Sequence, residues 1–173
     1  YDLAISYYKK VLELNPNEAI SHYNIGNALQ ADDRLDAAID SYKQALKINP
    51  EDIDAYNNMA VTLQKQGKSK EAIKVYKQAI QIDSSQSEPY FNMGNALREE
   101  GHKQAAIESY KQAIKIDPGS AVLHLNLGAV LNDIGKADAA LKSYQRALKV
   151  DPTYAAAHTN IGIIMAAKGN PNA

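Results

Sequence analysis

Histidine, serine and paired carboxylate side chains are the residues of this sequence whose chemistry could support catalysis or metal binding. There are four histidines and no cysteine, which excludes disulfides, thiolate metal sites and cysteine nucleophiles. His124 and His158 are 34 residues apart, which is one period of a repeat that runs through the sequence. Helices of neighbouring repeats are about 10 Å apart, whereas zinc–ligand bonds measure about 2 Å, so the two histidines cannot bind the same ion. The serines that recur beside tyrosines have no histidine base and orienting carboxylate at a suitable position. We therefore expect no catalytic residues, no metal site and no cofactor. We interpret His22, His124 and His158 as packing residues and place His102 in a turn.

An asparagine that recurs at a constant spacing along the whole chain is the strongest candidate for a binding surface. This asparagine column consists of Asn24, Asn58, Asn92, Asn126 and Asn160. Because an amide places a donor beside an acceptor, it could pair with the backbone of an extended peptide whatever the peptide's side chains. An extended peptide advances about 3.3 Å per residue and neighbouring first helices are about 10 Å apart, so successive asparagines would contact every third residue of the peptide. The alternative is structural: asparagine at this place could support contacts between repeats.

Other residues of the same expected groove could add binding energy or modify it. Tyr23 and Phe91 are candidate aromatic anchors, because aromatic side chains in a groove tend to dominate binding energy. We predict that the remaining groove residues are Leu125, Asn27, Asn95 and Arg98. Asn27 recurs only once, as Asn95, and is expected to be at most a local modifier.

A 34-residue repeat must position these side chains. Its clearest column is a tyrosine, at Tyr8, Tyr42, Tyr76, Tyr110 and Tyr144, with an alanine four residues before each. Each period contains two helical patterns, in which apolar residues recur at i, i+3, i+4 and i+7. Glycine ends the first helix in several periods, as at Gly67 and Gly101, and Asp-Pro or Asn-Pro ends the second in most of them. The sequence therefore predicts a series of paired helices.

These columns resemble the tetratricopeptide repeat (TPR) over essentially the whole chain. The order is aromatic or His, x2, Leu-like, Gly/Ala, x2, Leu, and then Ala, x3, Tyr, x2, Ala and Pro. The tryptophan usual in the first helix is replaced by His22, Tyr56, Tyr90, His124 and His158. The resemblance implies an all-α fold, a right-handed superhelical solenoid of antiparallel helix pairs whose first helices line a concave groove.

The family resemblance also suggests two ways in which such a groove could be used. The asparagine column is similar to one in the TPR region of O-linked N-acetylglucosamine transferases, where it holds the substrate backbone. The companion aspartates of those proteins are not matched here. TPRs that clamp a terminal carboxylate use lysine and arginine on successive first helices, and the corresponding positions hold Tyr23 and Glu88. We therefore expect no carboxylate clamp.

Helix counting predicts ten helices in one solenoid segment. We expect half repeats at 1–16 and 155–173, which flank four full repeats at 19–52, 53–86, 87–120 and 121–154. The last helix carries Ile161, Ile163, Ile164 and Met165, which would cap an array poorly. We therefore expect either that the segment is a piece of a longer protein or that its end packs on another chain.

Composition limits the choice of partner. The formal net charge is −1 with both signs abundant, whereas nucleic-acid and anionic-membrane binding need a concentrated cationic surface. No apolar run approaches the roughly 20 residues of a transmembrane helix, and no signal peptide is visible. A cytoplasmic location is expected, with a protein or peptide partner and neither nucleic acid nor membrane.

Three functions remain open from the sequence. The first is a non-catalytic scaffold that binds an extended peptide in the concave groove. The second is the substrate-recognition arm of a larger enzyme, such as a glycosyltransferase. The third is an assembly unit that self-associates through its terminal helices. For the first, we expect loss of Asn58 and Asn92 to weaken binding with little effect on melting temperature.

Overall fold

The computed structural model describes residues 1–169, and this part of the chain consists of ten α-helices joined by short turns. The chain divides into two compact units, the first covering Tyr1–Ser85 and the second beginning at Gln86. The ten predicted helices are confirmed within these residues, and α10 ends at Gly169. The predicted single solenoid segment and its repeat boundaries stay predictions, and the end of the half repeat expected at 155–173 lies outside the described residues.

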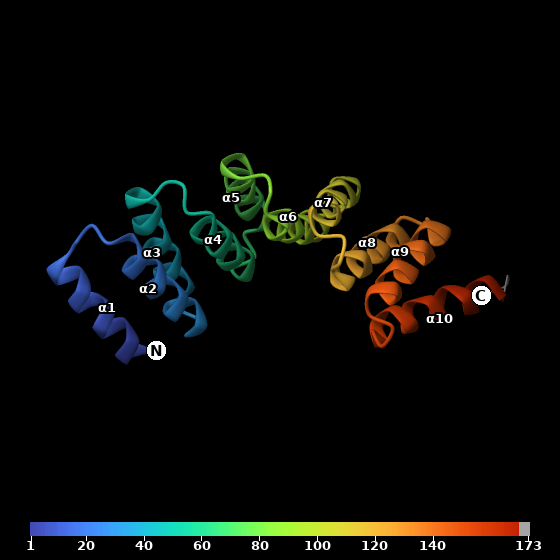
Figure 1. The fold of residues 1–173 in the computed structure, drawn as a ribbon, viewed down its shortest axis with the longest axis horizontal. Helices are drawn as coiled ribbons and strands as arrows, with labels where there is room; N and C mark the ends of the chain where they lie inside the picture. Colours follow the sequence, from blue (N-terminus) through green and yellow to red (C-terminus); the bar gives the residue numbers. More distant parts are fainter. Residues whose placement is uncertain (170–173) are drawn as a thin grey trace. The chain divides into compact units, whose positions relative to one another are not determined.

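Unit 1 contains five helices, coloured blue to green in Figure 1. They are α1 (Asp2–Leu14), α2 (Ala19–Ala31), α3 (Leu35–Ile48), α4 (Ile53–Lys65) and α5 (Ser69–Ile82). Each helix packs on the next in sequence, and α2 also touches α4. This arrangement is that of stacked antiparallel helix pairs, with α2 and α4 as neighbouring first helices.

Unit 2 has the same organisation, coloured green to red in Figure 1. Its helices are α6 (Ser87–Glu99), α7 (Lys103–Ile116), α8 (Ala121–Asp133), α9 (Ala137–Val150) and α10 (Ala155–Gly169). Consecutive helices pack on one another, and α8 also touches α10. Positions two periods apart in the sequence therefore occupy equivalent places in the two units.

The recurrent tyrosine forms the centre of each helix pair. Tyr42, Tyr76 and Tyr110 are 0% exposed and Tyr144 is 2% exposed, so each ring is enclosed between a first and a second helix. The facing position is glycine in three of the four pairs, because a Cβ at Gly26, Gly94 or Gly128 would lie 2.5–2.6 Å from the ring. Glycine at this column therefore sets how closely the two helices approach.

The recurrent serines of the second helices bond to their own backbone. The hydroxyls of Ser41, Ser109 and Ser143 donate to the carbonyl four residues earlier, at 2.9–3.1 Å. This arrangement satisfies a hydroxyl inside a helix without any partner from elsewhere. It gives these serines a structural explanation in place of a nucleophilic one.

The turns follow the predicted chemistry. Gly67, Gly101 and Gly135 have φ of 74–79° after the first helix of their repeats, a region that glycine enters without steric cost. Asp33 takes the equivalent place in the first full repeat with φ 58°. The residues that end the second helices are extended, as at Asn49 and Asp151.

Candidate functional site

The predicted groove residues lie on the first helices of the repeats, and we call this surface the first-helix face. In unit 1 it carries Asn24, Tyr23 and Asn27 on α2 and Asn58 on α4. In unit 2 it carries Phe91, Asn92, Asn95 and Arg98 on α6, Leu125 and Asn126 on α8, and Asn160 on α10. All except the exposed Arg98 are half-buried. The structure therefore places these side chains at the surface of each unit rather than in its core.

In unit 1 the structure uses Asn58 and Asn27 to join neighbouring helices. The Asn58 Nδ2 donates to the Tyr23 hydroxyl at 2.9 Å and to the Asn27 Oδ1 at 3.1 Å. The Asn27 Oδ1 also accepts from the Tyr42 hydroxyl at 2.8 Å. These bonds connect α2, α3 and α4 through one amide oxygen. Asn58 therefore has a structural role whether or not it also binds a partner.

A second set of bonds reinforces the contact between α2 and α4. The Gln30 Nε2 donates to the Thr62 Oγ1 at 2.6 Å and to the Asn58 carbonyl at 3.3 Å. The Thr62 hydroxyl itself donates to the same carbonyl at 2.7 Å. Because Thr62 is completely buried, this network fixes the two first helices of unit 1 beside each other.

Unit 2 repeats the tyrosine–asparagine pair at the equivalent place. The Tyr110 hydroxyl donates to the Asn95 Oδ1 at 2.7 Å. The ring of Phe91 lies 6.0 Å from that of Tyr110, as the ring of Tyr23 lies 6.0 Å from that of Tyr42. The two expected aromatic anchors are therefore packed against core tyrosines, which holds them in place and reduces the area that they can offer to a partner.

Burial also changes the acidity of these tyrosines. It raises the pKa of Tyr110 to about 12, although the nearby Arg98 charge acts in the opposite direction. Burial, and then the neighbouring Tyr23, raise the pKa of Tyr42 above its usual range. The pKa of Tyr144 is raised in the same way, by burial and by Asp133. These hydroxyls therefore remain protonated donors at neutral pH.

The other asparagines of the column differ in how their amides are used. Asn24 and Asn160 form no side-chain hydrogen bond within the described residues. The Asn126 Nδ2 donates to the Val122 carbonyl of its own helix at 2.9 Å. Asn92 has an interaction of its own. The five members are thus not equivalent, although the sequence repeats them without change.

Asn27 and Asn95 are the residues whose importance the sequence reasoning missed. Their signal is a single recurrence two periods apart, since NIGNAL at 24–29 is matched by NMGNAL at 92–97. In the intervening repeat Val61 stands at this place, and the Tyr76 hydroxyl donates instead to the Gln64 Oε1 at 2.6 Å. The hydroxyls of Tyr42, Tyr76 and Tyr110 therefore each donate to an amide oxygen of the first helix, from one of two different positions.

His124 and His158 have structural contacts. His124 is buried, and its Nε2 lies 3.1 Å from the Pro118 carbonyl. His158 repeats the contact with the Pro152 carbonyl at 3.0 Å. Each ring therefore joins the start of a first helix to the turn before it. Within residues 1–169, no group of three or more histidine, aspartate and glutamate side chains is arranged to hold a metal ion.

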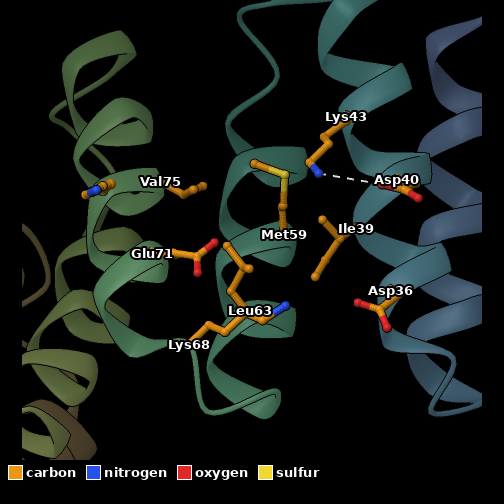
Figure 2. Close-up of a pocket in the computed structure, with 10 residues that line it drawn as sticks. Asp36, Ile39, Asp40, Lys43, Met59, Leu63, Lys68, Glu71 and Val75 are labelled. Carbon is orange, nitrogen blue, oxygen red and sulfur yellow. Dashed lines mark ion pairs between the residues drawn. The ribbon is translucent and has the colours of Figure 1, made fainter.

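Two pockets lie away from the asparagine column, at equivalent places in the two units. The α3–α5 pocket of unit 1 has a volume of about 400 Å³ and an apolar base that includes Met59 and Leu63. Figure 2 shows charged side chains of both signs around this base, and the Lys43 Nζ lies 3.5 Å from the Asp40 carboxylate. The α7–α9 pocket of unit 2 has a volume of about 430 Å³.

Sequence comparisons identify the repeats. A model described as "TPR repeat" matches residues 31–67 and 130–169. Two models described as "Tetratricopeptide repeat" match residues 51–119 and residues 7–40 and 109–142. Together these matches cover nearly the whole chain. No curated protein matches the chain in sequence.

Solved structures show the same fold. A crystal structure of MamA is 28% identical, covers 84% of this chain and 85% of its own, and has a TM-score of 0.79. YrrB, described as a TPR protein with an unusual peptide-binding site, is 25% identical, covers 91% and 81%, and has a TM-score of 0.77. MamA from Desulfovibrio magneticus RS-1 is 19% identical, covers 89% and 87%, and supports the fold alone with a TM-score of 0.80.

No helix within residues 1–169 has both the length and the apolar composition needed to cross a membrane.

Proposed function

We propose that this chain, which is built of tetratricopeptide repeats, is a non-catalytic module that binds an extended segment of a partner protein on its first-helix face. The observation that carries the proposal is the asparagine column. Asn24, Asn126 and Asn160 do not use their amides to join one helix to another. An amide that packing does not require can pair with the N–H and carbonyl groups of a bound backbone. The similar protein YrrB is described as having a peptide-binding site, which supports the same class of function.

Unit 2 offers the cleaner test, because Asn126 and Asn160 lie on the touching helices α8 and α10. A random peptide library would be selected against the chain, and the affinity of a selected peptide measured by titration calorimetry. Replacing both asparagines with alanine should weaken binding about tenfold, because each amide–backbone hydrogen bond contributes about 0.5–1.5 kcal/mol. The matched control removes two exposed amides from second helices, Gln112→Ala with Gln145→Ala, and should leave the affinity unchanged.

Changes to the peptide provide the second part of this test. If asparagine amides hold the backbone, N-methylation of one peptide bond should weaken binding more than exchange of the side chain beside it. An affinity that the Asn126 and Asn160 replacements do not alter would count against the proposal. So would a peptide that depends on its side chains alone.

The same face would suit the substrate-recognition arm of a larger enzyme such as a glycosyltransferase. The asparagine column supports both functions equally. The coding sequence that adjoins these 173 residues distinguishes them, because a catalytic domain there would favour the enzyme and further repeats would favour the scaffold.

Self-association through the terminal helices is a second candidate, favoured by apolar exposure on α10. Ile163 is 59% exposed and Met165 is 56% exposed, whereas Ile164 between them is buried. A second copy could cover the two exposed side chains. Light scattering over a wide concentration range tests this function, and a monomer at the highest concentration would rule it out.

A further inference from the structure

The α7–α9 pocket of unit 2 differs in charge from its equivalent in unit 1. Among the residues that line it, Lys111, Lys136, Lys142 and Arg146 are cationic, and none is acidic. In the α3–α5 pocket the lysines at the first three of these places are accompanied by Asp36, Asp40 and Glu71. The scaffold is the same, so the difference comes from the side chains that packing leaves free to vary.

Three substitutions between the repeats produce this difference, whereas Glu108 keeps the charge of Asp40. Gln104 stands where unit 1 has Asp36, Ala139 where it has Glu71, and Arg146 where it has Gln78. Arg146 also lies four residues after Lys142 on α9, and like charges at that spacing destabilise a helix by about 0.2–0.5 kcal/mol. Stability of the helix therefore does not explain the arginine.

The cations of this pocket are largely without partners. Lys111 is paired with Glu108 at 3.0 Å. Lys136, Lys142 and Arg146 form no side-chain ion pair or hydrogen bond within residues 1–169. The nearby Asp138 bonds instead to Lys168, and this bond is the main reason that its pKa is lowered, with Lys142 a smaller cause. Three positive charges are therefore available to a ligand.

The base of the pocket is apolar. It includes Ile114 of α7 and Leu127 and Leu131 of α8. At 3.6 residues per turn, Leu127 and Leu131 lie about 100° and 140° around the helix from Asn126. The pocket is therefore a different surface from the first-helix face.

We propose that the α7–α9 pocket is a second binding site, for an acidic protein segment that places a large apolar side chain on the leucines between carboxylates bound by Lys136, Lys142 and Arg146. Charge complementarity supports this choice of partner, since a cluster of one sign attracts the opposite sign and rejects its own. The arginine can bind a carboxylate through two parallel hydrogen bonds. Because the net charge of the whole chain is −1, the attraction is local to this pocket, which favours an acidic peptide over a long polyanion.

The probe for this site is a fluorescein-labelled peptide with one phenylalanine between two pairs of glutamates, measured by fluorescence anisotropy with the complete chain. The pocket variant Ala139→Glu with Arg146→Gln introduces the unit 1 side chains at two of the three differing positions and lowers the net charge by two. It should bind the probe about tenfold more weakly. A glutamate at Ala139 lies in the first turn of α9, where an acidic side chain is favourable, and circular dichroism would check that helicity is kept.

The matched control makes the same change of net charge in the equivalent pocket of unit 1, by Lys43→Gln with Lys68→Gln. It should bind the probe as the unaltered chain does. A second probe with alanine in place of phenylalanine should bind about tenfold more weakly, because the apolar contact is lost. In nuclear magnetic resonance spectra, amide shifts on adding the probe should be confined to α7, α8 and α9.

Several results would overturn this proposal. Binding by the Ala139→Glu, Arg146→Gln variant within twofold of the unaltered chain is one, and equal binding of the phenylalanine and alanine probes is another. An oligothymidylate of equal charge that competes as well as the peptide would show a general anion site instead. Since Asn126→Ala with Asn160→Ala should leave this binding unchanged, failure here is distinguishable from failure of the proposed function.

Discussion

The glycine that faces each core tyrosine allows the packing of a helix pair to be tested at one position. A Cβ added to Gly94 would lie 2.6 Å from Cε1 and 2.8 Å from Cδ1 of Tyr110, whereas carbon atoms in contact are normally about 3.5–4.0 Å apart. The ring or the helix would therefore have to move by about 1 Å. The ring has no free space, since Tyr110 is 0% exposed and its hydroxyl is bonded to Asn95.

Two opposing effects determine the stability of Gly94→Ala. Overpacking costs about 1–3 kcal/mol, while alanine is favoured over glycine inside a helix by about 1 kcal/mol. We therefore expect a net loss of about 1 kcal/mol in the free energy of unfolding, measured by urea denaturation with circular dichroism. Because repeat arrays can unfold in parts, hydrogen exchange of α6 and α7 should show the loss locally.

Gly162 supplies the control, because it occupies the same repeat position and a Cβ there would meet nothing within 4 Å. Gly162→Ala should stabilise α10 by up to about 1 kcal/mol, since only the helix propensity changes. The difference between the two variants measures the packing cost alone. If Gly94→Ala were as stabilising as Gly162→Ala, the reasoning would be refuted. The helix pair would then relax at no cost, as α4 and α5 accommodate Ala60 opposite Tyr76.

Three further predictions concern the hydrogen bonds of the first-helix face. Tyr110→Phe removes the bond to Asn95 and should destabilise by about 1 kcal/mol in urea, and Tyr144→Phe should cost less, because that hydroxyl has no such bond in residues 1–169. The pKa of Tyr110 is about 12 in the folded chain and about 10 in the unfolded chain, so the unfolded chain loses this proton first. The stability that Tyr110 contributes below pH 10 should therefore fall as the pH rises through 12. Tyr110→Phe should flatten this fall in alkaline titrations followed by circular dichroism. Asn58→Ala should lower the unfolding free energy by about 1–2 kcal/mol by thermal melting, whereas Asn126→Ala should stay within about 0.5 kcal/mol.

The fold could be predicted from the sequence because the same packing recurs in every period. The tyrosine column and the small residue that faces it had to recur together, since a larger residue opposite Tyr42 or Tyr110 would collide with the ring. The turn glycines recur at places with positive φ, which glycine adopts without steric cost and which only Asp33 occupies otherwise among residues 1–169. Such constraints are local and act in each repeat, so the sequence displays them as columns.

The use of the asparagines could not be predicted in the same way, because it depends on which neighbour lies within reach. Asn58 and Asn126 occupy the same place in the repeat, but Asn58 donates to the preceding first helix whereas Asn126 donates to its own helix. At the place of Tyr23, α6 has Phe91, which has no hydroxyl to accept the bond. A change at one position therefore alters the role of another 35 residues away, and a single column considered alone cannot reveal it.

The same reasoning indicates where partners of this chain should be sought. Positions that face the core tyrosines hold only glycine or alanine in both units, because a larger side chain would carry a packing cost, and they distinguish no partner. Positions around the two pockets carry no such cost, and there Glu71 is exchanged for Ala139 and Gln78 for Arg146. A repeat protein can change a ligand preference cheaply only at positions of this second kind. Differences between equivalent pockets therefore predict binding specificity better than the columns that define the repeat.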